Sequence, residues 1–69
     1  MTDIYTISVV QPDRNVNERE EIEHEEFALA FAMSRVEQLG PGSTARVYSD
    51  NLSLVAEYEN TKSGIFRTQ

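Results

Sequence analysis

The chain has 69 residues, no cysteine and 39% hydrophobic residues. This length predicts a single domain, residues 1–69, near the lower limit of what folds without metal or disulfide support, and the lack of cysteine excludes disulfides and thiolate metal sites. Twelve acidic and six basic residues give a formal net charge of −6, which disfavours direct binding to nucleic acid or to an anionic membrane.

The apolar residues do not form a segment long enough to cross a membrane. The longest apolar run, residues 27–33, has seven residues, whereas a membrane-spanning helix needs about 20. The chain does not open with a basic and apolar leader sequence, so we expect a cytoplasmic protein, in the host cytoplasm if the protein is viral.

Residues 4–10 (IYTISVV) predict the first strand, because they are rich in β-branched and aromatic side chains. The alternation of a strand places Tyr5, Ile7 and Val9 on one face. Residues 11–15 (QPDRN) then have the composition of a turn.

Residues 18–24 (EREEIEH) fit either of two structures. Asn17 followed by Glu20 resembles the capping box that begins a helix. Alternatively, the segment is a short, exposed edge strand with Ile22 facing inward, and its charges discourage unwanted strand pairing. We favour the strand, because like charges three or four residues apart repel one another on a helix.

Residues 25–39 (EEFALAFAMSRVEQL) predict a helix, since they consist mainly of strong helix formers and begin with two glutamates that favour the positive end of the helix dipole. Gly40 suits a left-handed cap, and Pro41 prevents continuation of the helix.

This helix has more apolar positions than one face requires. At about 100° per residue, two sets emerge, and either could face the sheet. The remaining set would be covered by a partner chain, by a second copy or by residues 65–66, unless a domain this small shares both sets between its core and its loops. The first set is Ala28, Leu29, Ala32, Met33, Val36 and Leu39, and the second contains Phe27 and Phe31.

Residues 44–49 (TARVYS) and 52–58 (LSLVAEY) predict a hairpin. Asp50 and Asn51 would form its two-residue type I′ connection. The remaining residues, 60–69, form a polar tail that either frays or adds a short strand. These elements predict an α+β fold in which one helix packs on a three- or four-stranded, mainly antiparallel sheet, in the order β-β-α-β-β.

The residues needed for catalysis or for metal binding are not present in a suitable pattern. His24 is the only histidine, and it lies among carboxylates without a second histidine or a cysteine. The Gly40-Pro41-Gly42 segment ends a helix, whereas phosphate-binding loops precede one. We therefore expect a protein without enzymatic activity, cofactor or metal.

The acidic run beside the apolar run predicts a site for a partner protein with a basic surface. Carboxylates can take the place of phosphates in a basic groove, and aromatic side chains can anchor an interface. The alternative is a homodimeric structural or accessory subunit. The candidate binding residues are Glu18, Glu20, Glu21, Glu23, Glu25, Glu26, Phe27 and Phe31.

The segments NEREEIEHEE, FALAFAMSRVEQLG and TARVYSDNLSLVAEY follow one another in the chain. Their order and size resemble small bacteriophage-encoded inhibitor proteins, anti-CRISPR proteins among them. The resemblance covers residues 4–58 and includes no diagnostic motif. It implies a protein that binds and blocks a host protein, such as a nucleic-acid-handling complex, and it assigns no site residues.

Overall fold

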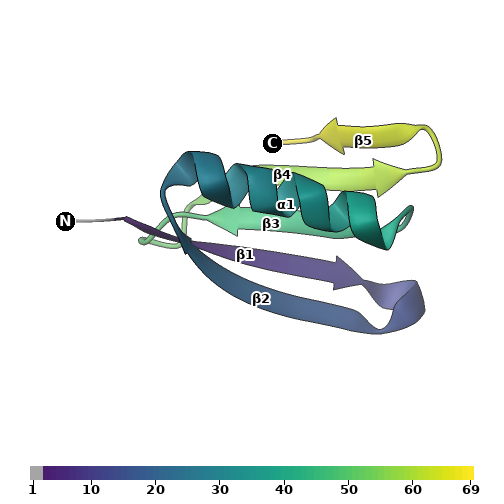
Figure 1. Cartoon of the computed structure of the whole chain (residues 1–69), viewed down its shortest axis with the longest axis horizontal. Helices are drawn as coiled ribbons and strands as arrows, with labels where there is room; N and C mark the ends of the chain where they lie inside the picture. The colour runs from purple at the N-terminus through teal and green to yellow at the C-terminus, as the bar shows by residue number, and fades with distance from the viewer. Residues whose placement is uncertain (1–2) are drawn as a thin grey trace.

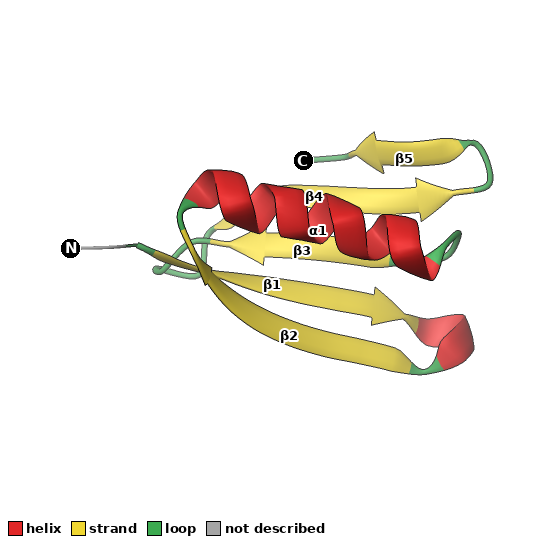
Figure 2. Cartoon of the chain, viewed as in Figure 1, coloured by secondary structure: helices red, strands yellow, loops and turns green. Residues whose placement is uncertain are grey.

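A computed structural model, which describes residues 3–69, shows one helix packed on a five-stranded antiparallel sheet (Figure 1). The strands lie in the order β2-β1-β3-β4-β5, and the helix covers one face of the sheet (Figure 2). The predicted α+β class is confirmed, but the sheet has more strands than the three or four expected. The elements are β1 (Ile4–Gln11), a 3-10 turn (Pro12–Arg14), β2 (Val16–Glu23), α1 (Glu25–Leu39), β3 (Thr44–Tyr48), β4 (Leu54–Thr61) and β5 (Gly64–Arg67).

The first two strands form a long hairpin that is closed by the predicted turn. They pair from Ile4 opposite Glu23 to Gln11 opposite Val16. Asn15 closes the turn with φ of 58°, and its N–H donates to the Pro12 carbonyl oxygen at 3.1 Å. Residues 18–24 were expected to form an edge strand, and β2 does lie at the edge of the sheet.

α1 has the predicted bounds, and the first of its two predicted apolar sets faces the sheet, with Met33 as the exception. Ala28, Ala32 and Val36 are fully buried against the sheet. Phe31 is half-buried beside this core, whereas the side chains of Phe27 and Met33 are 59% and 44% exposed. The first set therefore lies against the sheet apart from Met33, and the second is divided between the partly buried Phe31 and the exposed Phe27.

Two polar side chains from outside the helix bind its last turns. The carbonyl oxygen of Val36 accepts hydrogen bonds from the side-chain amide of Asn60 at 2.7 Å and from the N–H of Gly40 at 3.0 Å. The hydroxyl of Ser43 lies 3.1 Å from the same oxygen and 2.7 Å from the carbonyl oxygen of Gly40. Gly40 has a positive φ, of 87°, but its ψ of −174° lies outside the left-handed helical conformation that was predicted. Ser43 satisfies the Gly40 carbonyl, which the end of the helix leaves unpaired, and the Val36 carbonyl gains donors beyond its regular helical bond.

Gln11 makes a third connection between the sheet and the end of the helix. Its side-chain amide donates to the carbonyl oxygens of Leu39 and Pro41, both at 3.1 Å. The side chain is buried, and its Oε1 atom has no hydrogen-bond partner. The end of β1 is therefore tied to the segment where the chain leaves α1.

The connection between β3 and β4 differs from the predicted two-residue turn. It spans residues 49–53, and Leu52, instead of Asp50 or Asn51, has a positive φ, of 66°. The Asn51 side-chain oxygen accepts hydrogen bonds from the Ser53 N–H at 3.2 Å and from the Ser49 hydroxyl. This local bonding by Asn51 supports a wider loop in place of a type I′ turn.

The C-terminal tail forms β5, which was one of its two predicted outcomes. β5 pairs antiparallel with β4. Ile65 packs against the core, whereas Phe66 is 50% exposed. The Arg67 guanidinium lies 5.9 Å from the centroid of the Tyr58 ring on the helix-covered side of the sheet. β5 thereby completes the sheet at the edge opposite β2.

Candidate functional site

The predicted carboxylates lie along one edge of the sheet. β2 pairs with β1 on one side, and no other strand of the described chain pairs with its outer side (Figure 1). α1 begins two residues after this strand ends, so the helix start continues the same acidic region. We call this region the acidic edge; its carboxylates are those of Glu18, Glu20, Glu21, Glu23, Glu25 and Glu26.

Strand alternation divides these carboxylates between the two faces of the sheet. Glu20 lies opposite the buried Ile7 and therefore on the helix-covered face, together with Glu18. Glu21 and Glu23 lie on the opposite, open face. The carboxylates of β2 therefore flank its free edge on both sides and do not form one flat patch.

Glu18 is already paired within the protein. Its two carboxylate oxygens accept hydrogen bonds from the Arg35 guanidinium at 2.7 and 2.6 Å. Arg35 also donates to the side-chain oxygen of Gln38 at 3.1 Å. This bidentate pair connects β2 to α1, and a binding partner would have to compete with Arg35 for Glu18.

The pair predicts a specific effect of pH on stability. The hydrogen bond from Arg35 holds the pKa of the Glu18 carboxyl below its ordinary value of 4.5, against the opposing effect of partial burial. A depressed pKa in the folded state contributes stability above the ordinary pKa, and this stability is lost as the pH falls through the folded-state pKa. As the pH falls from 5 to 3, we expect the free energy of unfolding of Glu18→Gln to decrease less than that of the wild type, because the variant has no carboxylate to protonate at this position.

Urea unfolding at a series of pH values checks this expectation. Glu37→Gln, which alters an exposed glutamate elsewhere on α1, is the matched control and should retain the wild-type pH dependence. The expectation is contradicted if the Glu18 and Glu37 variants lose stability in parallel with the wild type.

A hollow between β2 and α1 brings three of the predicted residues together. It has a volume of about 440 Å³. Glu18 and Glu20 reach it from β2, and Phe31 reaches it from α1. Predicted carboxylates and a predicted aromatic side chain thus line the same surface feature. The lining residues are Ile7, Val9, Glu18, Arg19, Glu20, Phe31 and Arg35.

The start of α1 combines negative charge with an exposed aromatic side chain. Glu25 and Glu26 occupy the first turn and are exposed. The Phe27 ring packs edge-on against the His24 ring, with centroids 5.8 Å apart and planes at 80°. Nearby, partial burial and then the negative charge of Glu25 raise the pKa of Tyr5. The carboxylates at this end of the molecule therefore create a negative potential around the same side chain, that of Tyr5.

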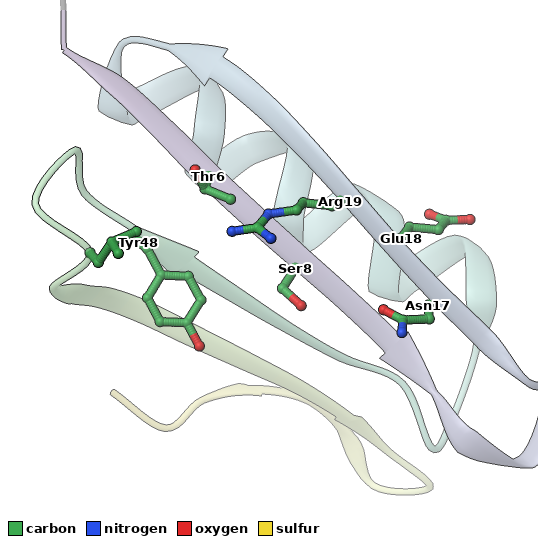
Figure 3. Close-up of a pocket in the computed structure, with 7 residues that line it drawn as sticks. Thr6, Ser8, Asn17, Glu18, Arg19 and Tyr48 are labelled. Atoms are coloured by element: carbon green, nitrogen blue, oxygen red, sulfur yellow. The ribbon is translucent and has the colours of Figure 1, made fainter.

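The open face of the sheet contains a groove that sequence reasoning did not predict. Its volume is about 360 Å³. Figure 3 shows the Arg19 guanidinium over β1, between Thr6 and Ser8, whereas the Glu18 carboxylate points away. The only sequence signal for this groove was the alternation of polar residues along β1. The full lining consists of Thr6, Ser8, Asn17, Glu18, Arg19, Tyr48 and Leu52.

The chemical groups of this groove suit hydrogen bonding. They comprise hydroxyls, an amide, a phenol and a guanidinium, with the Glu18 carboxylate pointing away from them. Across residues 3–69, no three histidine, cysteine, aspartate or glutamate side chains come together in a way that could hold a metal ion. Over the same residues, the helical structure includes no segment with the length and apolar character to cross a membrane.

Comparisons with known proteins give no match that would assign a function to the chain. The function of the chain is therefore inferred from its own residues and geometry. No family model matches the chain, and neither a curated protein nor a solved structure matches it.

Proposed function

We propose that this protein is a non-enzymatic binding module whose acidic edge binds a partner protein with a basic surface. The observation that carries the proposal is the location of charge: six of the twelve acidic residues lie on β2 and at the start of α1. Concentrated negative charge attracts a basic surface and accelerates encounter with it. Because exposed charges are screened by salt, association should slow as the ionic strength rises.

The exposed aromatic residue beside the acidic edge supports the same proposal. The Phe27 side chain is 59% exposed and lies directly after Glu25 and Glu26. A large aromatic side chain that becomes buried on binding can supply much of the affinity of an interface. Phe31 has less surface to offer, because it is already half-buried.

We further propose that the partner handles nucleic acid and is inhibited on binding. A basic groove that normally holds phosphates is the kind of surface that an acidic edge complements. Occupation of that groove would exclude the nucleic acid, which is the role implied by the resemblance to small phage inhibitors. The net charge of −6 also disfavours direct contact between this protein and nucleic acid.

A charge-reversal experiment tests the binding surface. Partners captured from extracts of the source cell are identified, and their affinity for purified variants is then measured by titration. We expect Glu20→Lys, Glu21→Lys and Glu23→Lys together to weaken binding by about tenfold or more. The control is Glu37→Lys, Asp50→Lys and Glu59→Lys, which alters exposed carboxylates outside the acidic edge.

Each triple variant raises the formal net charge from −6 to 0, since every reversal adds two charges. A difference between them therefore reports position and not total charge. Equal affinity of the two triple variants would contradict the acidic edge as the interface. Formation of a ternary complex with nucleic acid would contradict inhibition by exclusion, while leaving binding itself in place.

A homodimeric accessory subunit is the second candidate, and the outer side of α1 favours it. Phe27, Ala30 and Met33 recur at every third residue and are exposed. Two copies carry like charge, so salt should strengthen self-association, whereas it should weaken binding to a basic partner. Sedimentation equilibrium at low and high salt separates the two, and a monomer under both conditions would contradict the dimer.

A further inference from the structure

From the free edge of β2 we infer that the partner contributes an extended basic segment, which pairs with β2 as a sixth strand of the sheet. This inference deepens the proposed function and rests on it. It specifies backbone pairing with an extended chain, in addition to attraction between charged surfaces.

The first support is the unpaired backbone along β2. The strand has eight residues, Val16–Glu23, and pairs with β1 over its whole length. In an antiparallel pair, alternate residues direct their N–H and C=O groups away from the partner strand. Eight residues span about 26 Å, which is longer than an average strand. Such an edge is a template for the addition of another strand.

The second support is the charge that flanks this edge. β2 carries four glutamates and one arginine. A second copy of the protein pairing through the same edge would place glutamates opposite glutamates, and like charges at opposed positions destabilise a strand pair. A lysine- or arginine-rich strand would meet opposite charges instead. The edge therefore disfavours its own copy and selects a basic segment.

The positions of the carboxylates also define which positions of the partner's extended segment should be basic. Glu20 lies on the helix-covered face, and Glu21 and Glu23 lie on the open face. Cationic residues at consecutive positions of an extended segment would meet both faces of this half of β2. In the other half, Glu18 is held by Arg35 and Arg19 is itself positive. The segment should thus be basic at the end of β2 that leads into α1, and polar or acidic opposite Arg19.

A pair of synthetic peptides tests this inference on the full-length protein. The first peptide has eight residues, with four consecutive lysines flanked by valine and threonine on each side. The second carries N-methyl groups on two adjacent lysines, which blocks hydrogen bonding along both edges of the extended peptide and leaves its charges unchanged. We expect the unmodified peptide to bind at least about tenfold more tightly, because only it can complete the backbone pairing.

Amide hydrogen exchange in the complex locates the pairing. The fast-exchanging amides of β2 should slow by about tenfold or more when the unmodified peptide is bound. The amides of β5, Gly64–Arg67, form the opposite edge of the sheet and serve as the internal control. Their exchange should not change.

The possible failures distinguish this inference from the proposed function. Equal binding of both peptides, together with loss of binding in the triple reversal of Glu20, Glu21 and Glu23, would overturn strand pairing and leave an electrostatic interface. Protection of β5 in place of β2 would also overturn the inference. If neither peptide binds at low ionic strength, both proposals are contradicted.

Discussion

Asn60→Asp is expected to lower the free energy of unfolding by about 3 kcal/mol. Asn60 is 9% exposed, and its side-chain amide donates to the Val36 carbonyl oxygen at 2.7 Å. The substitution replaces this donor by a carboxylate oxygen, which repels the carbonyl oxygen and leaves a charge in a nearly buried position. For a domain of this size, a loss of about 3 kcal/mol lowers the melting temperature by roughly 15 °C.

Asn51→Asp is the matched control for this substitution. The Asn51 side chain is exposed, and its oxygen accepts the Ser53 N–H at 3.2 Å. An aspartate retains that acceptor, so we expect a change of no more than about 0.5 kcal/mol. Urea unfolding followed by circular dichroism measures both variants. Equal losses in the two would contradict a role for the Asn60 amide at the end of α1.

The pH dependence of the same variant provides a second check. Burial near a carbonyl oxygen should raise the pKa of the introduced carboxyl in the folded state above its value in the unfolded state. The protonated form can donate to the Val36 carbonyl oxygen again. The deficit relative to wild type should therefore be small at low pH and should grow as the pH rises through the folded-state pKa.

The elements that were predicted correctly depend on local signals. The bounds of α1 follow from helix-forming residues between a glutamate pair and Gly40, and these lie within one continuous segment. β2 was recognised as a strand because its like charges, such as Glu20 and Glu23, would repel one another on a helix. Neither conclusion needed knowledge of the rest of the fold.

The polar residues that bind the end of α1 could not be predicted in the same way. Gln11 is separated from its acceptor Leu39 by 28 positions in the chain, and Asn60 is separated from Val36 by 24. The sequence does contain a weak signal: each follows alternate buried residues of a strand, so each polar side chain occupies an inward-facing position. The partner that satisfies it becomes visible only when the helix is placed on the sheet.

The sequence predicted which residues make up the candidate site, but not how they are arranged in space. The sequence located the carboxylates, because six of them crowd into nine residues. Their division between two faces depends on the register between β1 and β2. The pairing of Glu18 with Arg35, 17 positions away, depends on where α1 crosses the edge strand. Long-range contacts of this kind leave no local pattern in the sequence.

Ala32→Leu is expected to lower the free energy of unfolding by about 2 kcal/mol. Ala28 and Ala32 of α1 are fully buried, and the same core includes Ala45 and Ala56 of the sheet. Small side chains in both layers leave little space between helix and sheet, because protein interiors are closely packed. A leucine at position 32 would therefore have to displace the helix or adopt a strained rotamer.

Ala30→Leu is the matched control, because Ala30 is exposed on the same helix and leucine is nearly as good a helix former as alanine. Its effect should stay within about 0.5 kcal/mol, and equal losses from the two leucine variants would contradict a packing effect. If Ala32→Leu displaces the helix, Val36 also moves away from Asn60. The double variant with Asn60→Asp should then lose less stability than the two single losses combined, since one displacement already disrupts both features. Strict additivity would show instead that the packing of Ala32 and the amide contact of Asn60 are independent.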